Sequence, residues 1–404
     1  MQIIEQPHIE LKGHQVGGFS FFLHKVFDSL KGSLLPASVF GISCLFFFGY
    51  NPFPEPVLLS FHAAFFVLLF LCVALLFYFN RTRPFFFLLN MLVSYLAING
   101  LKHNYGSIYW STAQYCYMAA VMPINLTVFY FCRQYRLKTR TNLYVLFALL
   151  LEFTIFEMLA KYDISLFAAP TVFGLNDISF CVFAACLVVA FFAVSESHNT
   201  KQIYLFFSML SLFCGFLFSS QPSAVCLFFV AAAAIVFMQI VLDIYNEATF
   251  DPSTGVFCAN ILFKHEQKFF PLKYSIAIMH LDNFEHIASS FSRKKTYKLV
   301  KMIVNQVAQN QDISGIYRTD YDEFLLVFYN KDRNSAVNSM EEIRRDIASS
   351  EFVLKKSKQP VKITISSVAA EKKRSDSGVA NVITRAQSIF NQGQKFAQNI
   401  TLKA

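Results

Sequence analysis

The stretch ISGIYRTDYDEFLLVFY, residues 313–329, decides the fold of the C-terminal part of this 404-residue chain. Two apolar runs, Ile313–Arg318 and Phe324–Tyr329, flank a short polar turn at residues 319–323. Apolar runs of this length that are separated by a few turn residues predict a β-hairpin. We therefore expect an antiparallel pair of strands at the centre of a sheet.

The sequence on either side of the hairpin alternates between helical and strand patterns. Lys273–Leu281 (KYSIAIMHL) is a short apolar run that suits a buried strand. The other predicted elements are helices at Lys294–Gln309, Ser335–Ser349 and Val379–Lys395 and a strand at Val361–Ala369. This order predicts an α+β sandwich in which helices pack on a sheet.

Four short segments of this region are similar to motifs of the GGDEF domains, the catalytic modules of bacterial diguanylate cyclases. Asp251–Val256 (DPSTGV) resembles the DxLTGL opening, and His280–Ile287 (HLDNFEHI) resembles DxDxFKxIND. Arg318–Phe324 (RTDYDEF) stands where the family has RxGGDEF, and Ile363–Val368 (ITISSV) resembles the TxSxGV strand. The resemblance covers about 150 residues in the family's order and implies a nucleotidyl-cyclase-like α+β fold.

The resemblance also implies a chemistry, which the residues here match only in part. Family members join two GTP molecules into cyclic di-GMP with Mg²⁺, which the first Asp of DxD and the third residue of GGDEF help to hold. These positions are His280 and Asp322 in this chain, while Asp282 and Glu323 match further acidic positions. Mg²⁺ prefers oxygen ligands, whereas an imidazole suits softer metals. One principal metal carboxylate is therefore replaced.

The phosphate and base positions of the family are also changed. The two glycines that let the backbone approach the phosphates are replaced by Asp320 and Tyr321, which add charge and bulk. The family's guanine-reading and C-terminal positions and its RxxD product-binding motif fall on residues of other types: Cys258, Ala288, Gly393, Phe396, Ala397 and Gln311–Ser314. An amide contact to guanine requires donor and acceptor groups that Cys and Ala lack.

These changes predict a catalytically degenerate GGDEF domain that requires no cofactor. Asp282, Asp322 and Glu323 are then relics of the fold within a signature turn that runs from Asp320 to Phe324. The alternative is an active diguanylate cyclase whose Mg²⁺ is held by His280 and Asp322. We expect the degenerate domain to bind other proteins: a second copy in a homodimer, other GGDEF domains, or an envelope complex for exopolysaccharide synthesis or secretion. Nucleic-acid binding is not expected, because no recognised module is present.

The rest of the chain is apolar. Hydrophobic residues make up 55% of the sequence and charged residues only 15%, and 39 of the 61 charged residues lie in the last 159 positions. Windows of about 17 to 25 apolar residues predict membrane-spanning helices. Eight such windows occur, at residues 34–50, 57–79, 85–101, 109–132, 141–159, 178–195, 203–219 and 223–242. We therefore expect an α-helical membrane bundle of about eight helices at 34–243 and a cytoplasmic domain at 244–404.

The N-terminal segment, residues 1–33, is expected to be cytoplasmic and to contain an amphipathic helix at Gly18–Lys31 on the inner membrane surface. An alternative is a lead-in that packs on the bundle.

The loop charges predict the orientation of the bundle. With eight spans, ten Lys and Arg residues fall on one side and only Lys102 and Lys161 on the other. The side rich in positive charge is cytoplasmic. The sequence therefore predicts a multi-pass protein of the bacterial inner membrane with both termini in the cytoplasm.

Glu152 lies near the middle of the fifth window, within LFALLLEFTIF. A carboxyl group at that depth is costly unless it is protonated, paired or directed into a polar interior, which makes it a functional candidate. The alternative is a protonated side chain that bonds neighbouring helices together. A transporter with an accessory domain is a further alternative, and it depends on Glu152 alone.

Overall fold

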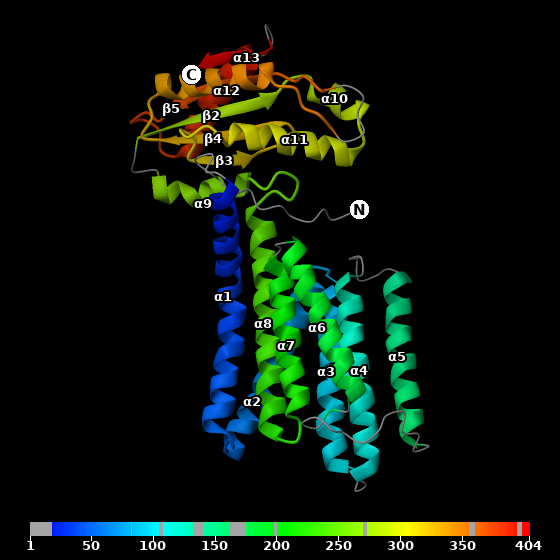
Figure 1. Ribbon diagram of the computed structural model, residues 1–404. Helices are drawn as coiled ribbons and strands as arrows, with labels where there is room; N and C mark the ends of the chain where they lie inside the picture. The colour runs from blue at the N-terminus through cyan, green and yellow to red at the C-terminus, as the bar shows by residue number, and fades with distance from the viewer. Residues whose placement is uncertain are drawn as a thin grey trace. The chain divides into compact units, whose positions relative to one another are not determined.

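The computed structural model describes residues 18–81, 83–104, 108–131, 140–161, 175, 177–197, 200–269, 273–354, 360–393 and 398–404. The chain divides into two compact units, one at residues 16–243 and the other containing residues 244–404. Figure 1 shows the helices of the first unit and the sheet of the second.

The described part of the first unit consists of long helices. They are α1 (Gly18–Tyr50), α2 (Glu55–Tyr78), α3 (Arg83–Asn104), α4 (Ile108–Phe131), α5 (Arg140–Lys161), α6 (Asp177–Ser197), α7 (Thr200–Leu217) and α8 (Pro222–Thr249). Helix α4 contacts α3, α5, α6 and α7, and α7 also contacts α1 and α6. Each of the eight apolar windows of the sequence falls mainly within one of these helices.

Four helices in the described ranges are long and apolar enough to cross a membrane: α1 over Gly32–Tyr50, α2, α6 over Asp177–Val194, and α8. The apolar stretches of α3, α4, α5 and α7 are shorter. The predicted amphipathic helix and the first window form one continuous helix, α1, that passes through Pro36. The side chains of Gly18–Lys31 and the segment before them lie outside the described residues.

The second unit is an α+β domain, as the sequence predicts. Its strands are β1 (Phe257–Cys258), β2 (Tyr274–Leu281), β3 (Gly315–Arg318), β4 (Glu323–Tyr329), β5 (Ile365–Glu371) and β6 (Thr401–Lys403). Its helices are α9 (Ala259–Phe269), α10 (Phe284–Ser290), α11 (Arg293–Val307), α12 (Arg333–Ser349) and α13 (Val379–Gly393).

The strands form one sheet in the order β1-β3-β4-β2-β5-β6. The central pairs β3–β4, β4–β2 and β2–β5 are antiparallel, and the two edge pairs are parallel. Strand β2 lies at the centre and pairs along its length with β4 and β5. The sheet therefore carries the hairpin and the end of β2 side by side.

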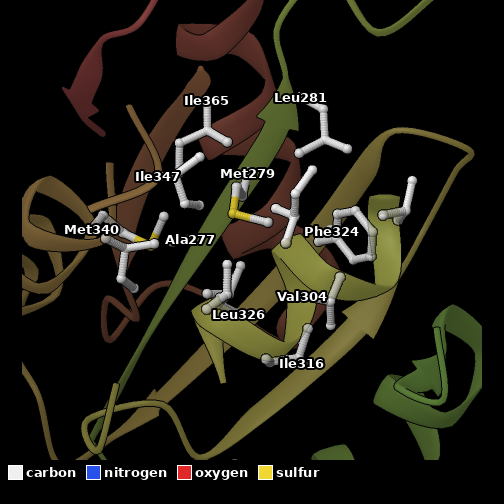
Figure 2. Packing of buried hydrophobic residues seen from close by; sticks show 14 of the residues in the cluster. Ala277, Met279, Leu281, Val304, Ile316, Phe324, Leu326, Met340, Ile347 and Ile365 are labelled. Carbon is white, nitrogen blue, oxygen red and sulfur yellow. The ribbon is translucent and has the colours of Figure 1, made fainter. Parts of the chain in front are cut away.

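Two apolar cores cover the two faces of this sheet. Successive side chains of a strand point to opposite faces. Ala277, Met279 and Leu281 of β2 contribute to the core with α10, α11 and α12, which Figure 2 shows from close by. Ile276 and Ile278 contribute to the other core, with α9 and α13. Alternation along β2 thus buries both faces of the sheet, which explains the continuous apolar run in the sequence.

The predicted hairpin, the strand before it and the three predicted helices are present in the structure, with ends that differ by a few residues. The predicted strand at Val361–Ala369 is shifted. Val361 forms an isolated bridge with Phe352, and β5 begins at Ile365 and extends to Glu371. The short edge strands β1 and β6 were not predicted from the sequence.

Candidate functional site

The candidate site lies where the signature turn of the β3–β4 hairpin meets the end of β2. His280 of β2 is directly opposite Glu323 of β4 in the sheet register. Beyond this pair, the backbone N–H of Leu281 donates to the carbonyl of Asp322 at 3.0 Å. Backbone hydrogen bonds between the strands thus bring together the residues of β2 and of the turn that were predicted from the sequence to form the site.

His280 and Asp322, the two expected metal positions, bond to each other. The Nε2 atom of His280 lies 2.9 Å from Oδ2 of Asp322, and the two side chains are 24% and 21% exposed. The His280 ring also lies near the ring of Phe390 on α13, with 6.1 Å between centroids. The carboxylate retained at the signature turn therefore has an imidazole as its immediate partner.

Asp282 is buried, with an exposed fraction of 4%. Its carboxylate accepts hydrogen bonds from the hydroxyls of Thr364 and Ser366, both at 2.7 Å, and from the backbone N–H of Asn399 at 2.9 Å. Its own N–H donates to the carbonyl of Thr364 at 3.0 Å. Buried carboxylates need such donors to offset the loss of water. Asp282 therefore joins the end of β2 to the start of β5 and to the C-terminal segment.

Tyr321 is half-exposed at the tip of the turn and packs on aromatic neighbours. Its ring centroid lies 5.1 Å from that of Phe284, the first residue of α10, and 6.4 Å from that of Tyr297 on α11. Its backbone N–H donates to Oδ1 of Asp320 at 2.6 Å. The position that is glycine in the family therefore carries a side chain that covers the start of α10.

Arg318 holds the turn from its other side. Its Nε donates to the carbonyl of Asp320 at 3.0 Å and its Nη2 to the carbonyl of Tyr321 at 2.6 Å. Its Nη1 donates to Oδ2 of Asp251 at 2.9 Å and also bonds the hydroxyl of Ser253. The Arg318 side chain is only 9% exposed. One side chain thus links the signature turn to the DPSTGV turn, where Gly255 adopts a positive φ of 82°.

The environment of Asp251 favours its ionised form. Burial by itself raises the pKa of this carboxyl, but hydrogen bonds from Ser253 and Thr254 and the charge of Arg318 outweigh that effect. The pKa of Asp251 therefore lies below its ordinary value. Asp251 and Arg318 form a charged pair that helps to build the site.

The other acidic residue of the turn, Glu323, bonds locally. Its Oε1 accepts from the hydroxyl of Thr319 at 2.8 Å, and its carbonyl accepts from the N–H of Thr319 at 3.0 Å. Both bonds close the turn on itself. Glu323 and Asp320 are thus committed to turn geometry in this structure.

The positions that read the base in the family have other surroundings here. Cys258 lies in β1 opposite Arg318, and burial, followed by the charge of Asp251, raises its pKa. Ala288 on α10 is partly buried and packs against the core to which α11 and α12 contribute. A Cβ atom added at Gly393 would clash with Cδ1 of Leu402, so a lysine there requires Leu402 to move. Phe396 and Ala397 lie outside the described residues.

The segment Gln311–Ser314, where the family has RxxD, is tied to the fold. Asp312 pairs with Lys331 at 2.8 Å and accepts from the hydroxyl of Ser339 at 2.6 Å. The hydroxyl of Ser314 accepts from the N–H of Tyr329 at 3.0 Å. No arginine occupies this segment.

The residues of the site do not fit a Mg²⁺ ion of the kind that the family implies. Mg²⁺ binds through hard oxygen ligands, usually one or two carboxylates. Asp322 is paired with an imidazole, and the oxygens of Asp282 already accept three hydrogen bonds. Among the residues that the structure describes, no group of three or more His, Cys, Asp or Glu side chains could hold a metal ion.

Glu152 belongs to the other unit and takes no part in this site. It lies on α5, and its Oε2 accepts a hydrogen bond from Nδ2 of Asn125 on α4 at 2.7 Å. The carboxyl group therefore forms a hydrogen bond between two helices, and its functional role stays a prediction.

Sequence reasoning missed the residues that bind these side chains. Arg318 has a clear sequence signal, because it is the arginine of the signature motif, but its bond to Asp251 joins positions 67 residues apart. Thr364 belongs to the predicted TxSxGV segment, yet its bond to Asp282 spans 82 residues. Asn399 binds Asp282 through its backbone N–H, so its residue type carries no signal.

Comparison with known proteins identifies the second unit. The family model described as "Diguanylate cyclase, GGDEF domain" matches residues 248–399. No curated protein sequence matches the chain significantly.

Three solved structures illustrate the similarity. The coiled coil and GGDEF domain of DgcB from Caulobacter crescentus, in complex with c-di-GMP, is 18% identical, with 41% of this chain and 90% of that chain covered and a TM-score of 0.36. Diguanylate cyclase SiaD from Pseudomonas aeruginosa, in complex with its activator SiaC, is 14% identical. The match covers 41% of this chain and 66% of that chain, with a TM-score of 0.37. The active GGEEF domain of a diguanylate cyclase from Vibrio cholerae is 18% identical, with coverages of 36% and 96% and a TM-score of 0.33.

The family match spans all four motifs, from the DPSTGV turn through the signature hairpin to the segment after β5. Residues 248–399 are therefore a GGDEF domain, and several apolar helices precede it in the chain.

Proposed function

We propose that this chain is a multi-pass inner-membrane protein whose GGDEF domain is catalytically degenerate and acts as a regulatory or scaffold module. The observation that carries the proposal is the pairing of His280 with Asp322 at 2.9 Å. In the family resemblance these are the two metal positions. Here one is an imidazole and the other its hydrogen-bond partner, so the metal-binding carboxylates needed for phosphoryl chemistry are reduced to one.

The signature turn supports the same proposal. The attacking hydroxyl and the phosphates of GTP need positioned charges and close backbone contacts. Asp320 puts a negative charge at that place, and Tyr321 fills space and packs on Phe284 at 5.1 Å. Arg318, whose guanidinium is of the type that binds phosphate, is instead bonded to two carbonyls of the turn and to Asp251. Compared with the family's site, this domain would therefore make weaker contacts both to a metal ion and to the phosphates of GTP.

Two well-packed cores support a binding role for the domain. Both faces of the sheet are covered by helices with buried apolar side chains, so the fold is maintained although the site is changed. A stable domain without competent catalytic residues still offers a surface for association. The partners we propose are a second copy of the chain, other GGDEF domains, or an envelope complex for exopolysaccharide synthesis or secretion, in a cyclic di-GMP signalling context.

The membrane location is supported by the apolar helices. Four of those described are long and apolar enough to cross a bilayer, and the remaining apolar windows coincide with α3, α4, α5 and α7. The ten-to-two distribution of loop Lys and Arg residues favours cytoplasmic termini. We therefore propose eight spans, with the GGDEF domain in the cytoplasm.

Calorimetric titration of GTP and cyclic di-GMP into the full-length protein in detergent tests the loss of the nucleotide site. We expect dissociation constants no better than about 1 mM, which corresponds to only ~4 kcal/mol. An active diguanylate cyclase titrated under the same conditions is the control. Micromolar binding of GTP would instead support the alternative, an active cyclase that uses His280 and Asp322. Micromolar binding of cyclic di-GMP alone would support a receptor.

A further inference from the structure

The helical unit contains a cavity of about 320 Å³ that is lined by α3, α4 and α5. Most of its wall is aliphatic, with Val93, Val121 and Leu149 as examples from the three helices. Ligand sites in proteins typically have volumes of about 300–1,000 Å³, apolar walls and a few polar groups. This cavity has the size of a site for a small molecule.

Two of its polar side chains are used by the helices themselves. Nδ2 of Asn90 donates to the carbonyl of Met122 at 3.2 Å, which links α3 to α4. The hydroxyl of Ser94 donates to the carbonyl of Asn90 at 2.9 Å, within α3. These bonds hold the wall together, and the side-chain oxygens of both residues stay able to accept a hydrogen bond from a ligand, although neither residue carries a charge.

The other polar lining residues are Tyr117 and Glu152, and Glu152 is the one of these with a carboxyl group that can orient a charged ligand. Its Oε2 accepts from Nδ2 of Asn125 at 2.7 Å, which fixes the carboxyl group in place. Its Oε1 has no hydrogen-bond partner among the residues that the structure describes. A carboxyl group in an apolar wall is stabilised by protonation or by a cationic partner, and a bound cation keeps the group ionised.

We propose that this cavity binds a small amphiphilic amine, whose apolar tail lies against the aliphatic wall and whose ammonium group donates to Oε1 of Glu152. An anion of the same shape is repelled by the carboxylate. A neutral alcohol forms a hydrogen bond without charge, and such bonds are weaker than charge-assisted ones. The inference concerns the helical unit alone and does not depend on the loss of cyclase activity in the GGDEF domain.

Equilibrium binding of tritiated octylamine to the full-length protein in detergent tests the proposal. Aliphatic amines are protonated at pH 7, because their pKa is near that of lysine. We expect saturable binding to the wild type and binding that is about tenfold weaker, or more, to Glu152→Gln. Unlabelled octylamine should compete well, octan-1-ol about tenfold less well, and octanoate not at all.

Two further variants separate the cavity from general effects. Glu55→Gln removes an exposed carboxylate at the start of α2, away from the cavity lining, and should bind octylamine as the wild type does. Val121→Phe fills part of the cavity without changing any charge and should weaken binding. The proposal is overturned if the wild type binds no octylamine, if Glu152→Gln or Val121→Phe binds it equally well, or if octanoate competes as well as octylamine.

Discussion

At the scale of single residues, Asp282 shows how an acidic position can serve the fold. Its carboxylate is 4% exposed and accepts hydrogen bonds from Thr364, Ser366 and the N–H of Asn399. Removal of a buried acceptor leaves its donors unpaired, which costs more than the bonds themselves contribute. From the sequence alone Asp282 was interpreted as a relic of the fold, and the structure shows the three donors that hold its carboxylate.

We predict that Asp282→Ala lowers the free energy of unfolding of the GGDEF domain by about 2–4 kcal/mol. Urea unfolding of a fragment of residues 246–404, followed by circular dichroism, measures this change. Glu323→Gln is the matched control, because the amide keeps the oxygen that accepts from Thr319, and it should alter stability by less than about 0.5 kcal/mol. Equal stability of Asp282→Ala and the wild type would show that the three hydrogen bonds do not support the fold.

At the scale of elements, the signature hairpin depends on Arg318. This residue bonds the carbonyls of Asp320 and Tyr321 and the carboxylate of Asp251, so one guanidinium joins two turns. Because the folded-state pKa of Asp251 is lowered, its contribution to stability is present above the ordinary pKa of 3.8 and is lost as the pH falls through the folded value.

Arg318→Gln should therefore destabilise the domain by about 2–3 kcal/mol at pH 7, and the difference from the wild type should shrink as the pH falls below 3.8 and through the lowered folded pKa of Asp251. Unfolding of the same fragment across this pH range measures both effects. Arg345→Gln is the control, since that arginine is 72% exposed and its ion pair with Glu341 is worth little. A constant difference at all pH values would exclude the pairing with Asp251 as its cause.

The elements also show what the sequence could predict. The hairpin, β2 and the helices have long apolar patterns, and each was expected within a few residues of its observed place. Strands β1 and β6 contain two and three residues, too few to show a period, and they form because β3 and β5 offer free edges. The pairs His280–Asp322 and Asp251–Arg318 join residues that are far apart in the sequence. They could be predicted only from the strand register and the tertiary contacts, which local sequence patterns do not contain.

At the scale of the whole molecule, the chain combines apolar helices with a GGDEF domain. The eight apolar windows coincide with α1–α8 because uninterrupted apolar runs of this length favour helices. The described structure contains four helices that meet the length and composition needed to cross a membrane. The number of spans remains a prediction that labelling can test.

Single cysteines in a cysteine-free variant test the orientation. A thiol-specific reagent that does not enter cells should react from outside with Glu55→Cys and Asp163→Cys but not with Lys138→Cys. The reason is the excess of Lys and Arg on the side that carries Lys138. Permeabilised cells, in which all three positions should react, are the control. Reaction of Lys138→Cys in intact cells would reverse the predicted topology.

The central claim is that the GGDEF domain does not make cyclic di-GMP, and synthesis from GTP by the purified full-length protein tests it most directly. The assay uses Mg²⁺ and, separately, Mn²⁺, with an active diguanylate cyclase as the positive control. We expect no product from the wild type. The variant with Asp320→Gly and Tyr321→Gly should also be inactive, because metal, phosphate and base contacts act as a unit and Cys258, His280, Ala288 and Gly393 remain. Cyclic di-GMP made by the wild type would contradict the account, and robust synthesis by the double variant alone would reveal a gated enzyme behind Tyr321.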